Sequence, residues 1–401
     1  MSETFGQALR RIRGNRSLRD VASLASCSKS YVCDLEHGRK APTPEMAAAL
    51  DQALGARGQL TALAALSATV QPLEQAAALQ RHLRDALAAG PVGETGLEEW
   101  AYTVARHGRA TRYRPERELL PELLADFTDL RLLLTHRHPD RTRKLLHVYV
   151  AQMSGLMALT LLKLGDPASR SWWRTGRQAA AAADDRAVLS WMYAHEAYQA
   201  YYSGDVYGAV ELAARAQQLA GGLPCVGPAL AAPLEARSLA ILGRRDATGE
   251  ALARAEIALS RLPEQERIGS AFGYSESQLR FHSGNAWTHL AETARARAEQ
   301  EQALALYPAE DHTDRALVRL DQAMCLVHEG DVASAAALTT DTIVGLPPEH
   351  RSTLIIYRAG DVAARVPEAT IGEVRVLREI LALPPSKEAG THGSGDGGDG
   401  S

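Results

Sequence analysis

Three runs of sequence near the N-terminus decide the fold of this region: Ser17-Leu18-Arg19-Asp20-Val21-Ala22, then Ser28-Lys29-Ser30-Tyr31-Val32-Cys33-Asp34-Leu35-Glu36-His37-Gly38-Arg39-Lys40, then Pro42-Thr43-Pro44-Glu45. Ser17 stands three residues before Asp20, which is the capping-box pattern of a helix start. Ser28 can cap a second helix, and Thr43 precedes a proline at the first position of a third. These runs therefore predict short helices separated by tight turns.

Apolar residues recur at helical spacing through the first 55 residues. Four stripes result, formed by Phe5, Ala8, Leu9 and Ile12, by Leu18, Val21, Ala22 and Ala25, by Val32 and Leu35, and by Met46, Leu50 and Leu54. Because each stripe occupies one helix face, the helices can bury them in a common core. The residues expected outside this core on the third helix are Lys29, Ser30, Tyr31, Cys33 and Asp34.

Two short helices joined by the turn Ser26-Cys27-Ser28 have helix-turn-helix geometry, in which the second helix enters the DNA major groove. The quoted runs resemble the Cro/C1-type (XRE family) helix-turn-helix domain over residues 4–55, including the ending Glu36-His37-Gly38-Arg39-Lys40-Ala41-Pro42. The family often has glutamine where Leu18 stands and Gly-Val where Ser26-Cys27 stands. No base contact is therefore carried over to Leu18.

The resemblance implies a set of DNA-binding residues: Arg19, Ser28, Lys29, Ser30, Tyr31, Asp34, Arg39 and Lys40. Lys29 suits guanine O6 and N7, Ser30 suits several base edges, and Tyr31 suits a thymine methyl group or a phosphate. Arg19, Arg39 and Lys40 are better suited to phosphates, which fix the register of a protein on DNA. Glu36 is expected to pair with Arg10 or Arg11 inside the domain. The alternatives are that these cations are ordinary solvated surface, or that the domain binds only protein.

Charge is unevenly distributed along the 401 residues. The net charge is -4, but residues 1–66 carry nine Lys and Arg against six Asp and Glu, whereas the remainder has a net charge of -7. A basic N-terminal region on an acidic body is compatible with phosphate binding by one end of the chain.

The rest of the chain is predicted to be helical, because Ala, Leu, Arg, Glu and Gln dominate it. Glycines suggest helical-hairpin boundaries at Gly165, Gly204, Gly243, Gly284 and Gly330, at intervals of 39, 39, 41 and 46 residues. Alanines at helical spacing follow two of them: Ala209, Ala213 and Ala216, and Ala251, Ala255 and Ala258. Small residues let helices pack closely, so this region resembles a tetratricopeptide-like α-solenoid, with a plain helical bundle as the alternative.

The expected architecture is all-α. It comprises a five-helix helix-turn-helix domain at residues 1–66, a helical connector and start of the solenoid at 67–164, tetratricopeptide-like repeats at 165–385, and a disordered Gly/Ser/Asp-rich tail at 386–401. Actinobacterial regulators have a similar arrangement of domains, and some of them control secondary metabolism or development.

Eight of the 21 aromatic residues fall between positions 172 and 207. Such a cluster favours either a ligand pocket on the concave face of the solenoid or ordinary packing between hairpins. The candidate ligand-binding residues are Trp173, Trp191, Tyr198, Tyr201 and Tyr202.

The sequence gives little support for a metal site, a redox switch or an enzyme active site. His136, His138 and His147 lie without a nearby cysteine, so solvated or capping histidines are favoured over a metal site. A redox role for Cys33 on the third helix is an open alternative. We find no phosphate-binding glycine loop, nucleophile elbow or His-Glu-x-x-His motif, and we expect neither enzyme activity nor a cofactor. Four scattered cysteines, no signal peptide and no uninterrupted membrane-spanning apolar stretch suggest a cytoplasmic protein.

Three functional hypotheses remain. In the first, a transcriptional regulator binds double-stranded DNA at a palindromic operator, and its body senses a small molecule or peptide. In the second, the body serves for homodimerisation and partner contacts alone. In the third, the chain is a protein-interaction scaffold whose helix-turn-helix domain does not contact DNA.

Overall fold

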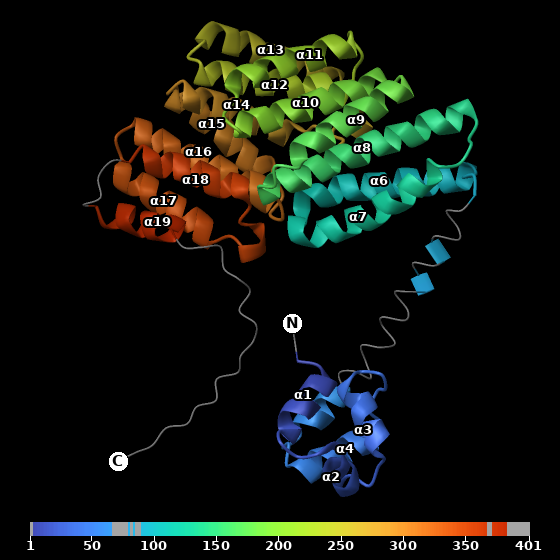
Figure 1. The fold of residues 1–401 in the computed structure, drawn as a ribbon. Helices are drawn as coiled ribbons and strands as arrows, with labels where there is room; N and C mark the ends of the chain where they lie inside the picture. The colour runs from blue at the N-terminus through green and yellow to red at the C-terminus, as the bar shows by residue number, and fades with distance from the viewer. Residues whose placement is uncertain (1–2, 66–78, 81–82, 85–89, 367–370, 383–401) are drawn as a thin grey trace. The chain divides into compact units, whose positions relative to one another are not determined.

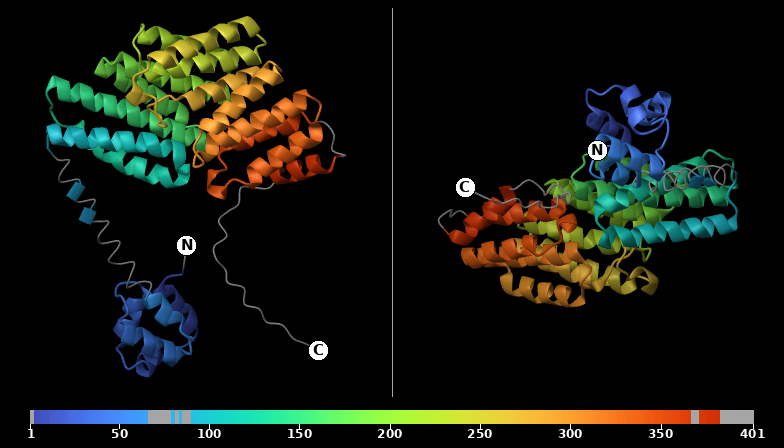
Figure 2. Two further views of the ribbon diagram at one scale, coloured as in Figure 1. Left: turned by 180° about the vertical axis from the view of Figure 1, so that it is seen from behind. Right: turned by 90° about the horizontal axis from the view of Figure 1, so that it is seen from below.

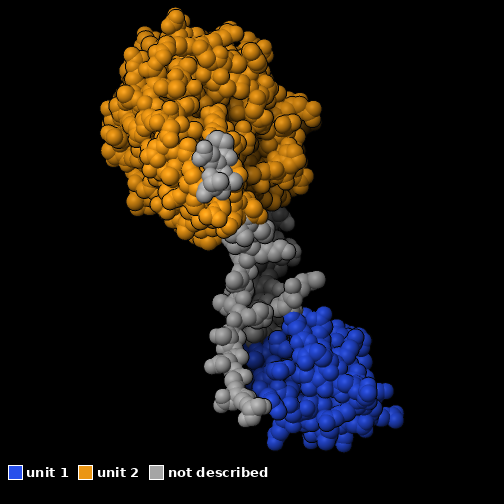
Figure 3. All heavy atoms as spheres, turned by 90° about the vertical axis from the view of Figure 1, so that its left-hand side faces the viewer, with its two compact units in different colours: residues 1–89 blue, residues 90–401 orange. Residues whose placement is uncertain are grey.

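The chain is all-helical, as predicted. A computed structural model describes residues 3–65, 79–80, 83–84, 90–366 and 371–382, and it contains no β-strand in these ranges. The chain divides into two compact units, residues 1–89 and 90–401 (Figure 3). The predicted tail at 386–401 lies outside the described residues, and the boundary predicted between residues 164 and 165 falls inside the second unit.

The first unit is built from short capped helices. They are α1 (Phe5–Arg13), α2 (Leu18–Leu24), α3 (Lys29–Glu36) and α4 (Pro44–Leu54), followed by a further helical segment at residues 59–65 (Figure 1). Thr4, Ser17, Ser28 and Thr43 each accept a hydrogen bond from the backbone three residues on, which satisfies an N–H that the helix leaves unpaired. The apolar stripes meet in one core that also includes Leu60 and Ala64. The predicted caps and stripes are therefore confirmed.

Asp51 fixes the last helical segment of this unit. Its buried carboxylate accepts hydrogen bonds from the N–H of Gly58 at 2.7 Å and from the N–H of Thr61 at 2.9 Å. Burial alone would raise the pKa of Asp51, but these hydrogen bonds outweigh burial and lower it. Asp51 thus joins the end of α4 to the segment at 59–65.

The second unit is a row of antiparallel helix pairs, as Figures 1 and 2 show. Its helices are α6 (Glu94–Tyr113), α7 (Glu116–Leu133), α8 (Asp140–Leu164), α9 (Ser169–Ala183), α10 (Arg186–Tyr202), α11 (Val206–Ala220), α12 (Val226–Ile241), α13 (Arg245–Arg261), α14 (Glu276–His289), α15 (Thr293–Leu306), α16 (His312–His328), α17 (Val332–Val344), α18 (Thr353–Ala364) and α19 (Gly372–Ala382). Short 3-10 turns cover Glu264–Glu266 and Pro348–His350.

The same tight turn joins five of these pairs. The first helix of each pair is followed by one residue with positive φ. The backbone N–H of the residue after it donates to the carbonyl oxygen five residues earlier, at 2.8–3.0 Å. The five residues are Gly165, Gly204, Gly243, Ala291 and Gly330. The intervals between them are therefore 39, 39, 48 and 39 residues, a more regular repeat than the glycines alone suggested.

The predicted boundary at Gly284 is wrong. Gly284 lies inside α14, where an added Cβ would approach the Cγ of Gln300 on α15 to 3.0 Å. This glycine therefore allows close helix packing, and the turn is at Ala291 instead. Buried alanines confirm the predicted close packing at Ala209, Ala213, Ala216, Ala251 and Ala255, whereas Ala258 is half-buried.

The single long interval has a structural cause. The connection between α13 and α14 has fourteen residues, 262–275, whereas those between α11 and α12 and between α15 and α16 have five each. The nine extra residues fold inward: the N–H of Ala271 donates to the carbonyl of Gly108 on α6 at 2.9 Å. Trp191 on α10 donates from Nε1 to the carbonyl of Ala271 at 2.7 Å. This loop therefore fills space between α6 and α10.

The first and last parts of the body contact each other. The helices α8, α10, α12, α14, α16 and α18 pack in that order, and α18 packs in turn against α8. Arg112 on α6 pairs with Asp314 on α16 at 2.6 Å and with Asp311 at 2.8 Å. The inner face of the repeats is therefore enclosed by the body's own helices.

Helix α8 differs from the sequence expectation in one respect. It has 25 residues and meets the length and composition of a membrane span, although no such stretch was expected. In the most apolar 18-residue stretch of this helix, 72% is buried inside the body. Burial of this kind is what a core helix of a globular domain shows.

Candidate DNA-binding surface

The N-terminal turn of α3 presents polar side chains to solvent. Ser28, Lys29 and Ser30 are exposed, and Val32 and Leu35 anchor the opposite face of the helix in the core. Ser28 accepts from the N–H of Tyr31 at 3.2 Å, so its hydroxyl caps the helix. Lys29 has no ion-pair partner among the described residues, and its charge adds to the positive end of the helix dipole. This end of α3 is therefore suited to binding an anion such as a DNA phosphate or an acceptor on a base edge.

The other residues predicted on this surface form a cluster. The carboxylate of Asp34 lies 3.4 Å from Lys40 Nζ and 3.6 Å from Arg39 Nε. Lys40 Nζ also lies 5.6 Å from the centre of the Tyr31 ring, which packs partly into the core. The structure thus brings Tyr31, Asp34, Arg39 and Lys40 together. In the free protein, Asp34 contacts the two cations predicted to bind phosphate, an arrangement the sequence did not indicate.

Arg19 completes the predicted set, and Cys33 is the remaining residue expected outside the core on α3. Arg19 is exposed at the second position of α2. Cys33 is half-buried, with Sγ 3.6 Å from Nδ1 of His37. The DNA contacts of all eight predicted residues stay predictions, because the structure contains the protein alone.

Glu36 ties α3 to α1, but mainly through a residue that the sequence did not single out. Its buried carboxylate pairs with Arg13 Nε at 2.5 Å and with Arg10 Nε at 3.5 Å. Pairing with Arg10 is thus confirmed and pairing with Arg11 is wrong, since Arg11 binds Glu3 at 2.7 Å. The hydrogen bond from Arg13 to Glu36 raises the pKa of the Arg13 guanidinium. This pair has a structural role beneath the surface.

Gly6 lets α1 approach the end of α3. A Cβ at this position would lie 2.6 Å from the carbonyl oxygen of Leu35 and 2.7 Å from that of Glu36. Only a residue without a side chain fits this contact. Gly6 therefore helps to set the position of α3, although no sequence signal marked it.

The two departures from the pattern of the family that this domain resembles lie in or beside its core, with Ser26 exposed. Leu18 and Cys27 are half-buried and pack against the apolar cluster. Ser26, where glycine is common, adopts a positive φ of 52°. The fold accommodates both departures.

The comparisons with known proteins agree with this geometry. Residues 4–64 match a protein-family model described as a helix-turn-helix domain. No curated protein and no solved structure matches the chain. The chain therefore carries an N-terminal helix-turn-helix domain, which suggests a DNA-binding regulator that contacts double-stranded DNA.

The aromatic residues predicted to bind a ligand lie mostly in the interior of the body. Trp173, Trp191, Tyr201 and Tyr202 are buried and Tyr198 is half-buried. Trp173 donates from Nε1 to the side chain of Gln199. This placement favours the packing alternative for the tryptophans, and ligand binding at these residues stays a prediction.

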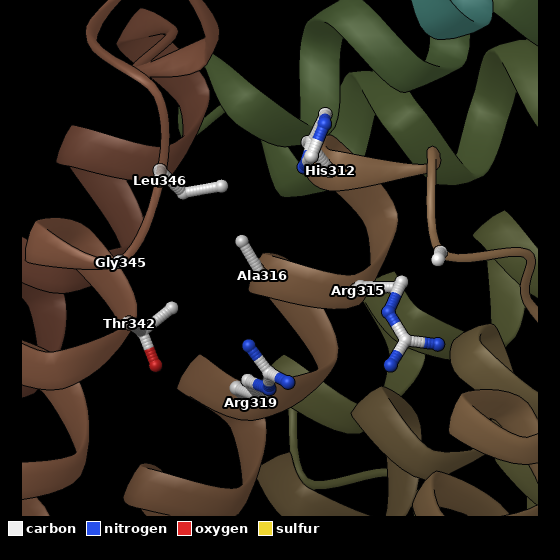
Figure 4. Close-up of a pocket in the computed structure, with 8 residues that line it drawn as sticks. His312, Arg315, Ala316, Arg319, Thr342, Gly345 and Leu346 are labelled. Carbon is white, nitrogen blue, oxygen red and sulfur yellow. The ribbon is translucent and has the colours of Figure 1, made fainter.

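A small surface hollow lies between α16 and the end of α17. His312, Ala316 and Arg319 of α16 face Thr342, Gly345 and Leu346 at the end of α17 (Figure 4). Its volume of about 210 Å³ is below the roughly 300–1,000 Å³ of ordinary ligand pockets. Arg315 at its edge already donates to the carbonyls of Leu304 and Tyr307.

Among the described residues, no three His, Cys, Asp or Glu side chains converge in a way that could hold a metal ion. His138, one of the three histidines considered for such a site, has Nε2 2.8 Å from the carbonyl of Leu133 at the end of α7. The capping interpretation is therefore confirmed for His138.

Proposed function

We propose that this protein is a sequence-specific transcriptional regulator of the Cro/C1 (XRE) type. In this proposal α3 enters the major groove, Lys29 and Ser30 contact base edges, and Arg19, Arg39 and Lys40 contact phosphates. The observation that carries it is the solvent-exposed N-terminal turn of α3, where Lys29 has no ion-pair partner among the described residues; the partly buried Glu36–Arg13 pair holds this helix in place.

A regulator also needs an input, and we assign it to the tetratricopeptide-like body. The support is the repeated turn, which recurs at 39 residues in three of four intervals, and the enclosed inner face that carries aromatic and polar residues. A small molecule or peptide bound there would shift the equilibrium between conformations of the body that differ in DNA affinity. The body also supplies a homodimer interface in this proposal, since two half-sites about 34–36 Å apart require two domains.

We assign neither enzyme activity nor a cofactor to the chain, and we place the protein in the cytoplasm with the DNA. The burial of α8 within the body supports this location over a membrane.

Selection from a random double-stranded DNA library by the purified full-length protein tests the proposal. We expect enrichment of a palindromic motif whose half-sites are one helical turn apart. A protein that binds DNA without enriching any motif would contradict sequence-specific regulation. A protein that retains no DNA at all would favour the scaffold hypothesis.

A further inference from the structure

Five successive inner helices of the body each contribute one buried polar side chain to a continuous chain of hydrogen bonds. These are Tyr201 of α10, Arg237 of α12, Asn285 of α14, Asp321 of α16 and Arg358 of α18, each at most 6% exposed. Asn285 lies at the centre: its Oδ1 accepts from Arg237 Nε at 2.8 Å and from the Tyr201 hydroxyl at 2.9 Å. Its Nδ2 donates to both oxygens of Asp321 at 2.9 Å.

The two buried arginines of this chain differ in their charge partners. Arg358 pairs with Asp321 at 2.5 Å and with Asp361 at 2.8 Å. Arg237, which is 0% exposed, has no carboxylate within ion-pair distance in the described part of the chain. Its Nη2 donates to the Tyr202 hydroxyl at 3.2 Å, and its Nη1 is buried without any hydrogen-bond acceptor. A buried charge without a counterion is costly, because neutral partners compensate it incompletely.

Aromatic rings surround the Arg237 guanidinium. Its central carbon lies 4.1 Å from the centre of the Tyr201 ring, 5.3 Å from Phe281 and 5.5 Å from Tyr202. These cation–π contacts offset part of the cost of burial but provide no acceptor for Nη1. Arginine stays protonated at every physiological pH, so the site cannot avoid the charge by titration.

Two neighbours of this aromatic cage retain solvent-accessible surface. Tyr198 is half-buried, with its ring centre 4.7 Å from that of Tyr202. His289 is half-buried, with Nε2 3.0 Å from the Tyr201 hydroxyl. Burial, followed by the nearby arginines, lowers the pKa of His289 well below its usual value, so this histidine is neutral. Both residues therefore keep some exposure beside the cage, and of the two buried arginines near His289 only Arg237 lacks a carboxylate partner in the described part of the chain.

We infer that Arg237 binds the carboxylate of a small organic acid whose apolar part lies against the rings of Tyr198, Tyr201 and Tyr202. A carboxylate matches one uncompensated guanidinium in charge and in its planar arrangement of acceptors. A phosphate dianion matches it less well, because its second charge would be unbalanced and Asp321 is only one side chain further along the chain. The inference rests on the sensing role proposed above and names the ligand class for it.

Thermal unfolding of the full-length protein tests this site directly. The probes are acetate, benzoate and 3-phenylpropionate, each compared with its uncharged amide at equal ionic strength, and inorganic phosphate. Because a ligand that binds the folded state raises Tm, we expect the aromatic acids to raise Tm and their amides to have no effect. A rise with phosphate equal to that with the acids would contradict the carboxylate assignment, and no acid-specific rise in the wild-type protein would overturn the inference.

Variants separate ligand binding from a structural role of Arg237. Arg237→Met leaves Asn285 Oδ1 bonded to Tyr201, so we expect it to fold without a loss of Tm and without a response to the acids. Arg237→Lys retains the charge but loses the planar donor pair, and we expect about tenfold weaker acid binding. Arg261→Met, at an exposed arginine at the end of α13, is the matched control and should respond as wild type does. An unchanged response in both Arg237 variants would overturn the inference.

The result is distinguishable from a failure of the regulator proposal, because Tm is measured without DNA. An acid-specific shift in a protein that enriches no DNA motif would leave the site intact and remove the regulator. An enriched DNA motif without an acid-specific Tm shift would remove the site and leave the regulator intact.

Discussion

The carboxylate of Asp34 on α3 lies 3.4 Å from Nζ of Lys40, so an acidic residue contacts one of the cations proposed to bind DNA phosphates. Arg39 lies 3.6 Å from the same carboxylate. Asp34 is therefore placed either to position both cations or to compete with phosphates for them. A third role is that Asp34 accepts a hydrogen bond from a base, since the family resemblance places it among the DNA-binding residues.

Asp34→Asn distinguishes these roles. If Asp34 competes with phosphate, the variant should bind both specific and nonspecific DNA more tightly and show a steeper salt dependence, because two cations are released. If it accepts a hydrogen bond from a base, the variant should instead lose affinity for the selected motif. Gel shifts at several salt concentrations measure both quantities. Glu45→Gln on α4 makes the same change in net charge, and an equal gain in this control would assign the effect to net charge alone.

Arg39→Ala tests the phosphate role of the loop after α3. We expect the variant to lose affinity for every DNA sequence by a similar factor and to reduce the salt slope by about one unit, since one phosphate contact disappears. The enriched motif should stay the same. Arg319→Ala removes an equal charge from the body and should have no effect. A changed motif in Arg39→Ala would mean that this arginine contacts a base instead.

Asp51→Asn tests what holds the end of the helix-turn-helix domain. The variant loses the charged acceptor for the N–H groups of Gly58 and Thr61. The free energy of unfolding of residues 1–89 should therefore fall by about 1–3 kcal/mol. The pKa of Asp51 is lowered in the folded protein, so its stabilisation is complete above the usual aspartate pKa and is lost as pH falls through the folded value. Urea unfolding of a fragment of residues 1–89, at a series of pH values, measures the free energy of unfolding of wild type and variant. The difference between wild type and variant should therefore shrink in acid, and a difference that grows in acid would contradict the assignment.

Ala291→Gly should stabilise the body by about 1 kcal/mol. Ala291 is exposed and has a φ of 56°, a conformation that costs an L-residue energy and that glycine adopts at the equivalent turns. Thermal unfolding of the full chain measures this change. Ala298→Gly, an exposed alanine inside α15, is the control and should destabilise by a similar amount. A loss of stability in Ala291→Gly would show that this turn is formed differently.

The sequence predicted those features that depend on neighbouring residues. The caps at Ser17 and Ser28 and the turns at Gly204 and Gly243 follow from local side-chain and backbone chemistry, and the structure confirms them. Which face of one helix meets another helix depends on tertiary packing rather than on neighbouring residues. The sequence therefore did not identify Arg13 as the principal partner of Glu36.

The same distinction explains the error in the repeat. A glycine signals either a turn or a close helix contact, and the sequence could not tell these apart at Gly284. Ala291 carries no local signal for a positive φ at all. The chain of hydrogen bonds through Arg237 and Asn285 joins residues that are 48 positions apart in the sequence, so only the folded body reveals it.

The central claim is that the exposed turn of α3 contacts bases, and the specificity of Lys29→Ala tests it most directly. Library selections with the wild-type and variant proteins should yield motifs that differ at one base position in each half-site. The variant should also lose about 1–3 kcal/mol of affinity for the wild-type motif. An unchanged motif with unchanged affinity in a folded variant would contradict the claim.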